Sequence, residues 1–80
     1  MTRYAVAWVD IAEDQYQALS GQQQRLIDAR VAQMLEDPET NSSYDRRTDQ
    51  WTTTDSASVG LITFVFRPDR PRLVILRLIY

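Results

Sequence analysis

The sequence contains neither cysteine nor histidine among its 80 residues, and it has only two glycines. Without cysteine there are no disulfides or thiolate nucleophiles, and without histidine the usual general base near neutral pH and a common zinc ligand are missing. Gly21 and Gly60 are too few for a glycine-rich loop that cradles phosphate, and the carboxylates lack the spacing of a metal site. We therefore expect no metal and no other cofactor.

Long hydrophobic runs and an excess of positive charge are also absent. No window approaches 18 apolar residues, and residues 1–10 lack the features of a signal peptide, so we expect a soluble, cytoplasmic protein without a membrane segment. A chain of this length with 44% hydrophobic residues predicts one domain, residues 1–80. Nine arginines stand against eleven acidic residues, giving a net charge of −2, so any contact with nucleic acid must be local.

The pattern of apolar residues predicts a strand, two helices and then three strands. The strands are expected at residues 4–9, 50–54, 60–66 and 72–80, where β-branched and aromatic residues concentrate. Residues 39–49 are mostly polar and predict a long exposed loop. The expected fold is α+β, with a helix hairpin packed on a mainly antiparallel four-stranded sheet. The last strand is apolar on both faces apart from Arg77, as in a central strand.

Capping signals predict where the helices begin. Asp10 followed by Glu13 is typical of an N-cap with a supporting carboxylate, and Ser20 with Gln23 predicts a capping box for the second helix. Pro38 predicts the end of that helix, because the residue before a proline is disfavoured in the α region.

Three features together resemble the RelE/ParE superfamily of bacterial toxins. They are the opening Tyr-Ala-Val-Ala-Trp strand, a helix that closes in Leu-Glu-Asp-Pro at residues 35–38, and two hydrophobic strands around a short polar turn. The resemblance extends over almost the whole chain. It implies a toxin of a type II toxin-antitoxin system that is neutralised by a cognate antitoxin protein. It also implies action either as a ribosome-dependent mRNA endonuclease or, in the ParE branch, on DNA gyrase.

The basic residues that this resemblance would imply for RNA cleavage are largely missing. The nuclease branch places basic residues on the strand after the long loop, where this sequence has Thr52 and Thr54, and an arginine where it has Gly60 and Leu61. Further arginine and tyrosine residues are implied in a tail, whereas this sequence ends at Tyr80. We therefore expect weak or absent endoribonuclease activity, and the assignment as an enzyme stays open.

Several arginines are candidates for contact with a nucleic acid or a protein partner. Arg46 and Arg47 are adjacent in the long loop, with Tyr44 nearby for stacking, but Asp45 and Asp49 are also consistent with a solvated charge pair. Arg67 and Arg72 flank the last turn, where they would bind an anion or simply keep the turn soluble.

Two residues of the final strand are the weak catalytic candidates. Arg77 interrupts an apolar strand, which indicates either a functional position or a solvent-facing side. Tyr80 suits a proton donor or a stacking group by resemblance, although core packing is the favoured interpretation.

An alternative hypothesis is a non-catalytic interaction module on the same scaffold. In that case Leu73, Ile75 and Ile79 would form a homodimer face. The acidic balance and the missing basic positions favour this alternative. A neutralising partner would indicate the toxin, and self-association would indicate the module.

Overall fold

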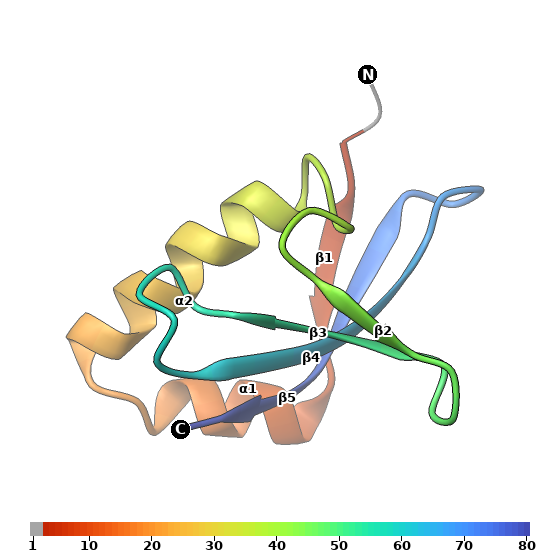
Figure 1. Ribbon diagram of the computed structural model, residues 1–80. Coiled ribbons are helices and arrows are strands. Elements are labelled where there is room, and N and C mark those ends of the chain that lie inside the picture. Colours follow the sequence, from red (N-terminus) through yellow and green to blue (C-terminus); the bar gives the residue numbers. More distant parts are fainter. Residues whose placement is uncertain (1–2) are drawn as a thin grey trace.

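The computed structural model describes residues 3–80, which form two helices and five strands (Figure 1). The elements in chain order are β1 (Ala5–Trp8), α1 (Asp10–Gln17), α2 (Gly21–Met34), β2 (Ser43–Asp45), β3 (Gln50–Thr54), β4 (Leu61–Arg67) and β5 (Arg72–Ile79). The strands form one sheet in the order β1-β5-β4-β3-β2, in which only β1 and β5 run parallel. The expected α+β fold with a mainly antiparallel sheet is confirmed, and β5 is a central strand.

The sheet has one strand more than expected, because the polar loop at residues 39–49 contains β2. Ser43–Asp45 pairs with β3, and Tyr44 lies opposite Trp51 with 5.1 Å between ring centroids. Cross-strand aromatic pairs stabilise short hairpins, and this pair holds a segment with little other apolar content. The Thr53 hydroxyl also donates a hydrogen bond of 2.8 Å to the carbonyl of Asn41, which fixes the loop before β2.

The two helices begin in different ways. α2 has the predicted capping box, since the Ser20 hydroxyl accepts from the Gln23 N–H at 3.2 Å and the Gln23 side chain accepts from the Ser20 N–H at 3.0 Å. α1 has Val9 at its N-cap without a side-chain hydrogen bond, so the prediction of Asp10 as the cap was wrong by one residue. Asp10 instead lies in the first turn, where a carboxylate interacts favourably with the helix dipole.

One hydrophobic core joins both helices to a single face of the sheet. It consists of Ala12 from α1, Ile27, Val31 and Met34 from α2, and Ile62, Phe64, Leu73, Ile75 and Leu78 from the two central strands. Full burial of one such side chain contributes roughly 1.5–3 kcal/mol, so this cluster is the main source of stability.

A β-bulge in β5 decides which side chains point into this core. Phe64 pairs with Ile75 but its neighbour Thr63 pairs with Arg77, so Leu76 is an extra residue on β5. An extra residue exchanges the faces of a strand. Leu78 therefore joins Ile75 on the helix side, while Arg77 moves to the opposite side.

The opposite side of the sheet has no helix over it in the part of the chain that the structure describes. We call it the open face. It includes Ala5 and Ala7 of β1, Thr52 and Thr54 of β3, Leu61, Thr63, Val65 and Arg67 of β4, and Arg72, Val74, Arg77 and Ile79 of β5. Among residues 3–80 no helix is both long enough and apolar enough to cross a membrane.

Candidate functional site

Arg77 is the cation at the centre of the candidate site on the open face. Its side chain is exposed and lies opposite Thr63, whose own exposed fraction is 5%. Arg77 also borders a groove of about 420 Å³ between α1 and the C-terminal half of β5. The guanidinium has no ion-pair partner among residues 3–80. The bulge therefore presents an unpaired cation, available for an anionic group.

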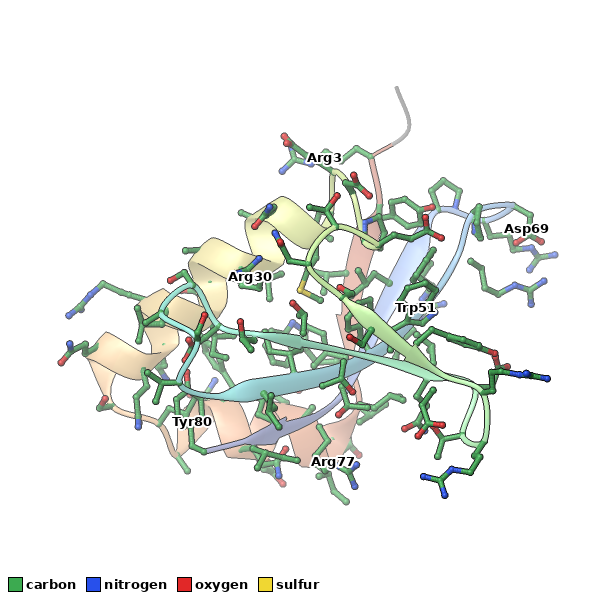
Figure 2. The ribbon with its side chains drawn as sticks, viewed as in Figure 1. Arg3, Arg30, Trp51, Asp69, Arg77 and Tyr80 are labelled. Atoms are coloured by element: carbon green, nitrogen blue, oxygen red, sulfur yellow. The ribbon has the colours of Figure 1, made fainter. Side chains whose placement is uncertain are left out.

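The other predicted cations do not converge on Arg77. Arg72 shares the open face, but five residue steps at about 3.3 Å each place it roughly 16 Å along β5. Arg67 is paired with Asp69 at 3.0 Å in the β4–β5 turn. Figure 2 shows Arg77 near the C-terminal end of β5 and Asp69 at the far end of the molecule.

Arg46 and Arg47 lie in the turn between β2 and β3, apart from the β4–β5 turn (Figure 1). Both arginines are exposed, and Arg47 is 3.9 Å from Asp45 with 93% of its side chain accessible. The hydroxyl of Tyr44 donates to Asp49, so this tyrosine is already engaged within its own turn. The predicted arginines therefore lie in three separate places: Arg77, the cross-strand pair Arg67 and Arg72, and Arg46 with Arg47 in the β2–β3 turn.

Tyr80 holds the turn between β3 and β4 in place, a role that the sequence did not predict. Its hydroxyl donates a hydrogen bond to the carboxylate of Asp55, and its ring lies over Gly60, where an added Cβ would come within 2.5 Å of a ring carbon. Tyr80 is 44% exposed and lies outside the hydrophobic core, so the favoured interpretation as a core residue was wrong. Burial, followed by the hydrogen bond to Asp55, raises the pKa of Tyr80 well above its usual value.

Asp55 is fully buried at the start of the turn between β3 and β4. Its carboxylate accepts the backbone N–H groups of Ala57, Val59 and Gly60 at 2.9, 3.0 and 3.0 Å, in addition to the Tyr80 hydroxyl. Burial alone would raise the pKa of Asp55, but these hydrogen bonds outweigh burial and lower it below its ordinary value. The only sequence signal for this role is an aspartate at the head of a polar turn.

The β3–β4 turn also contacts α2, so the buried carboxylate of Asp55 organises a turn that connects the sheet to this helix. The Ser56 N–H donates to the Leu26 carbonyl at 3.2 Å, and an Arg30 side-chain N–H reaches the Asp55 carbonyl at 3.5 Å. Asp55 and Tyr80 thus join the end of β5, the β3–β4 turn and the second helix. The Tyr80 hydroxyl is engaged in its hydrogen bond to Asp55, and its raised pKa means that it keeps its proton.

The proposed homodimer face needs a correction. Leu73 and Ile75 have no exposed surface, because they pack against the helices within the same chain. Ile79 is 45% exposed and pairs with Leu61, which is 40% exposed, on the open face. The prediction placed these three residues on one face by strict alternation, which the bulge breaks.

The chemistry available on the open face is anion binding and apolar contact. Its described side chains on β1, β3, β4 and β5 are mainly threonines, aliphatic residues and the three arginines Arg67, Arg72 and Arg77, and Asp45 lies at the β2 edge. RNA cleavage needs a group that moves protons as well as a cation that stabilises the phosphate. The open face supplies the cation.

Neither protein-family models nor curated protein sequences gave a match to this chain. Among solved structures, a chain of the toxin-antitoxin complex RelBE2 from Mycobacterium tuberculosis superposes with a TM-score of 0.77 at 17% sequence identity. The alignment covers 98% of each chain, so no element of either fold is left over. The fold of this protein is that of the RelE/ParE-like toxins, as the sequence pattern indicated.

Proposed function

We propose that this protein is a toxin-like component of a type II toxin-antitoxin system, with a cognate antitoxin protein as its partner. The observation that carries the proposal is the match over 98% of both chains to a chain from a toxin-antitoxin complex. Fold alone does not determine function, so the proposal also rests on the open face, which exposes a cation and apolar side chains on one surface.

We further propose that the protein acts by binding and is weak or inactive as an endoribonuclease. Arg77 and Arg72 lie roughly 16 Å apart along the backbone of β5, and the Tyr80 hydroxyl is engaged with Asp55. A target on the ribosome and its mRNA, or DNA gyrase, would then be occupied without being cut. Cytoplasmic localisation follows from either target.

The test is induced expression in a bacterial host, with growth, bulk translation and plasmid supercoiling measured together. We expect growth arrest that is relieved by co-expression of a cognate antitoxin, to be sought among small reading frames adjacent to the gene. Arg77→Ala should relieve the arrest, whereas Arg25→Ala, an exposed arginine of α2 away from the open face, should not. A fall in translation indicates the ribosome, and a fall in supercoiling indicates gyrase.

The nuclease question is answered separately in a translating extract supplied with the purified protein. We expect intact mRNA. Cleavage that Arg77→Ala abolishes would overturn the binding-only mechanism while leaving the toxin assignment in place.

A second candidate function is a non-catalytic homodimerisation module, and one observation favours it. Leu61 and Ile79 are exposed neighbours on the open face, beside the half-buried pair Val65 and Val74. Harmless expression, together with a dimer in analytical ultracentrifugation that Ile79→Asp dissociates, would establish this module and exclude the toxin.

A further inference from the structure

The two edges of the sheet differ in how they are protected against pairing with another strand. The β2 edge is only three residues long and fully exposed, and it ends in Asp45, which Arg46 and Arg47 follow directly. Short, charged edges resist the addition of a further strand. The β1 edge is four residues long and lacks the charges, since Ala5–Trp8 is uncharged, has no proline and contains no bulge.

The outward side of β1 carries backbone groups that the fold does not use. The N–H groups of Ala5 and Val9 donate to the carbonyls of Pro71 and Ile75 at 2.9 and 3.1 Å, so alternate residues face β5. Val6 and Trp8, the residues in between, therefore direct their N–H and carbonyl groups away from the sheet. β1 is the last strand of the order on this side, in the part of the chain described.

A groove of about 420 Å³ runs beside this free edge on the helix side. Its lining consists of Val6, Ala7 and Trp8 from β1, Glu13, Tyr16 and Gln17 from α1, and Asp28 from α2. The rings of Trp8 and Tyr16 lie 5.2 Å apart and form an aromatic wall. A strand added to β1 would direct every second side chain into this groove, because side chains alternate along a strand.

The charge of the groove selects the occupant. Glu13 and Asp28 are exposed, and neither has an ion-pair partner among residues 3–80; Asp28 accepts only the Tyr16 hydroxyl, at 2.8 Å. A basic side chain would lay its methylene groups along Trp8 and bring its cation to these carboxylates. A second copy of this chain, pairing through β1, would instead bring the same two carboxylates of both copies into one groove.

We propose that β1 is a docking edge for an extended segment of a different protein, one that adds a strand beside Ala5–Trp8 and carries basic residues at alternate positions. Main-chain hydrogen bonds to Val6 and Trp8 supply affinity, and Glu13 with Asp28 supplies selectivity. The free edge and the acidic groove support this docking mode whether or not expression of the protein arrests growth.

The test uses two peptide probes of equal length, acetyl-(Lys-Val)₃-amide and acetyl-(Glu-Val)₃-amide, titrated into ¹⁵N-labelled protein at low salt. We expect the lysine peptide to shift the amide signals of Val6 and Trp8 and to leave β2 unaffected. The glutamate peptide should shift neither. Val6→Pro, which removes an N–H that the fold does not use, should abolish binding of the lysine peptide.

A second pair of variants keeps the test valid if the proline variant does not fold. Glu13→Gln/Asp28→Asn should weaken the lysine peptide by roughly fivefold or more, as expected for two partly exposed ion pairs. Asp45→Asn/Asp49→Asn, with the same change of charge at the other edge, should have no effect. Equal binding of both peptides, no binding of either, or shifts confined to other strands would overturn the proposal. Self-association through β1 would assign the edge to a second copy instead.

Discussion

The hydrogen bond between Tyr80 and Asp55 gives the sharpest prediction of stability. In Tyr80→Phe the ring that covers Gly60 stays, and only the hydroxyl that donates to the buried carboxylate is lost. Hydrogen bonds to charged groups contribute about 1.5–3 kcal/mol. Three backbone N–H groups still bind the carboxylate in the variant, so we take the lower part of that range. The free energy of unfolding should fall by about 1.5–2 kcal/mol.

Urea denaturation followed by tryptophan fluorescence measures this loss, and an unchanged slope with urea would show that the unfolded state is unaffected. The melting temperature should fall by about 6–16 °C for a domain of this size. Tyr44→Phe is the matched control, because its hydroxyl also donates to an aspartate but both groups are exposed. Its free energy of unfolding should change by less than about 0.5 kcal/mol.

The effect of Tyr80→Phe should depend on pH in one direction. The pKa of Asp55 is lowered in the folded protein relative to its ordinary value of 3.8, so the charged carboxylate stabilises the fold above that pH. This stabilisation is lost as the pH falls through the lowered pKa of the folded state. The difference between wild type and Tyr80→Phe should therefore be full at pH 7 and shrink as the pH falls below 3.8 toward the lowered pKa of the folded state. If the free energy of unfolding falls no more in Tyr80→Phe than in Tyr44→Phe, or if its fall does not depend on pH, the hydrogen bond between Tyr80 and Asp55 does not stabilise the fold as proposed.

Three further changes test how the C-terminal half of β5 is held. Gly60→Ala should destabilise the protein by about 1–3 kcal/mol in urea denaturation, because the new methyl group collides with the Tyr80 ring, and the loss should be much smaller in a Tyr80→Ala background. Gln15→Ala should speed amide hydrogen exchange at Leu78 and lower the free energy of unfolding by about 0.5–1.5 kcal/mol, because the side-chain oxygen Oε1 of Gln15 accepts that N–H at 2.7 Å. Deletion of Leu76 should leave unfolding cooperative in circular dichroism, because it removes only the extra residue, and the regular strand that results keeps Arg77 facing outward and Leu78 facing the core.

The order of the elements could be predicted from the sequence because each boundary has a local signal. Ser20 and Gln23 define the start of α2 through one capping box, and Pro38 lies just beyond its end. The strand near Tyr44 was missed because its stability comes from a partner, Trp51, which only the hairpin brings into contact. A sequence pattern reveals a helix cap, whose partners are a few residues apart, but it does not reveal which strands will pair.

The candidate site was harder to predict for the same reason. Strict alternation put Leu73, Ile75 and Ile79 on one face, and a single bulge separated the first two from the third. Asp55 carries no distinctive motif, because its partners are three backbone N–H groups and a tyrosine 25 positions away. No spacing rule in the sequence relates Tyr80 to Asp55.

The bulge has a consequence for how this fold can act on a target. It allows one arginine to stand in the middle of an otherwise apolar strand without entering the core, since Arg77 faces outward while Ile75 and Leu78 face inward. Burying an unpaired guanidinium costs several kcal/mol, so this sequence, paired in a regular strand without the bulge, could not keep a cation at this position. A cation kept there, between Thr63 and exposed Ile79, suits recognition of a surface that offers both an anion and apolar contact. Cleavage would require a second polar group within hydrogen-bond distance of the same phosphate, and the tyrosine nearest in sequence is bound to Asp55. The bulge therefore favours a role in which the open face holds its target and leaves it chemically unchanged.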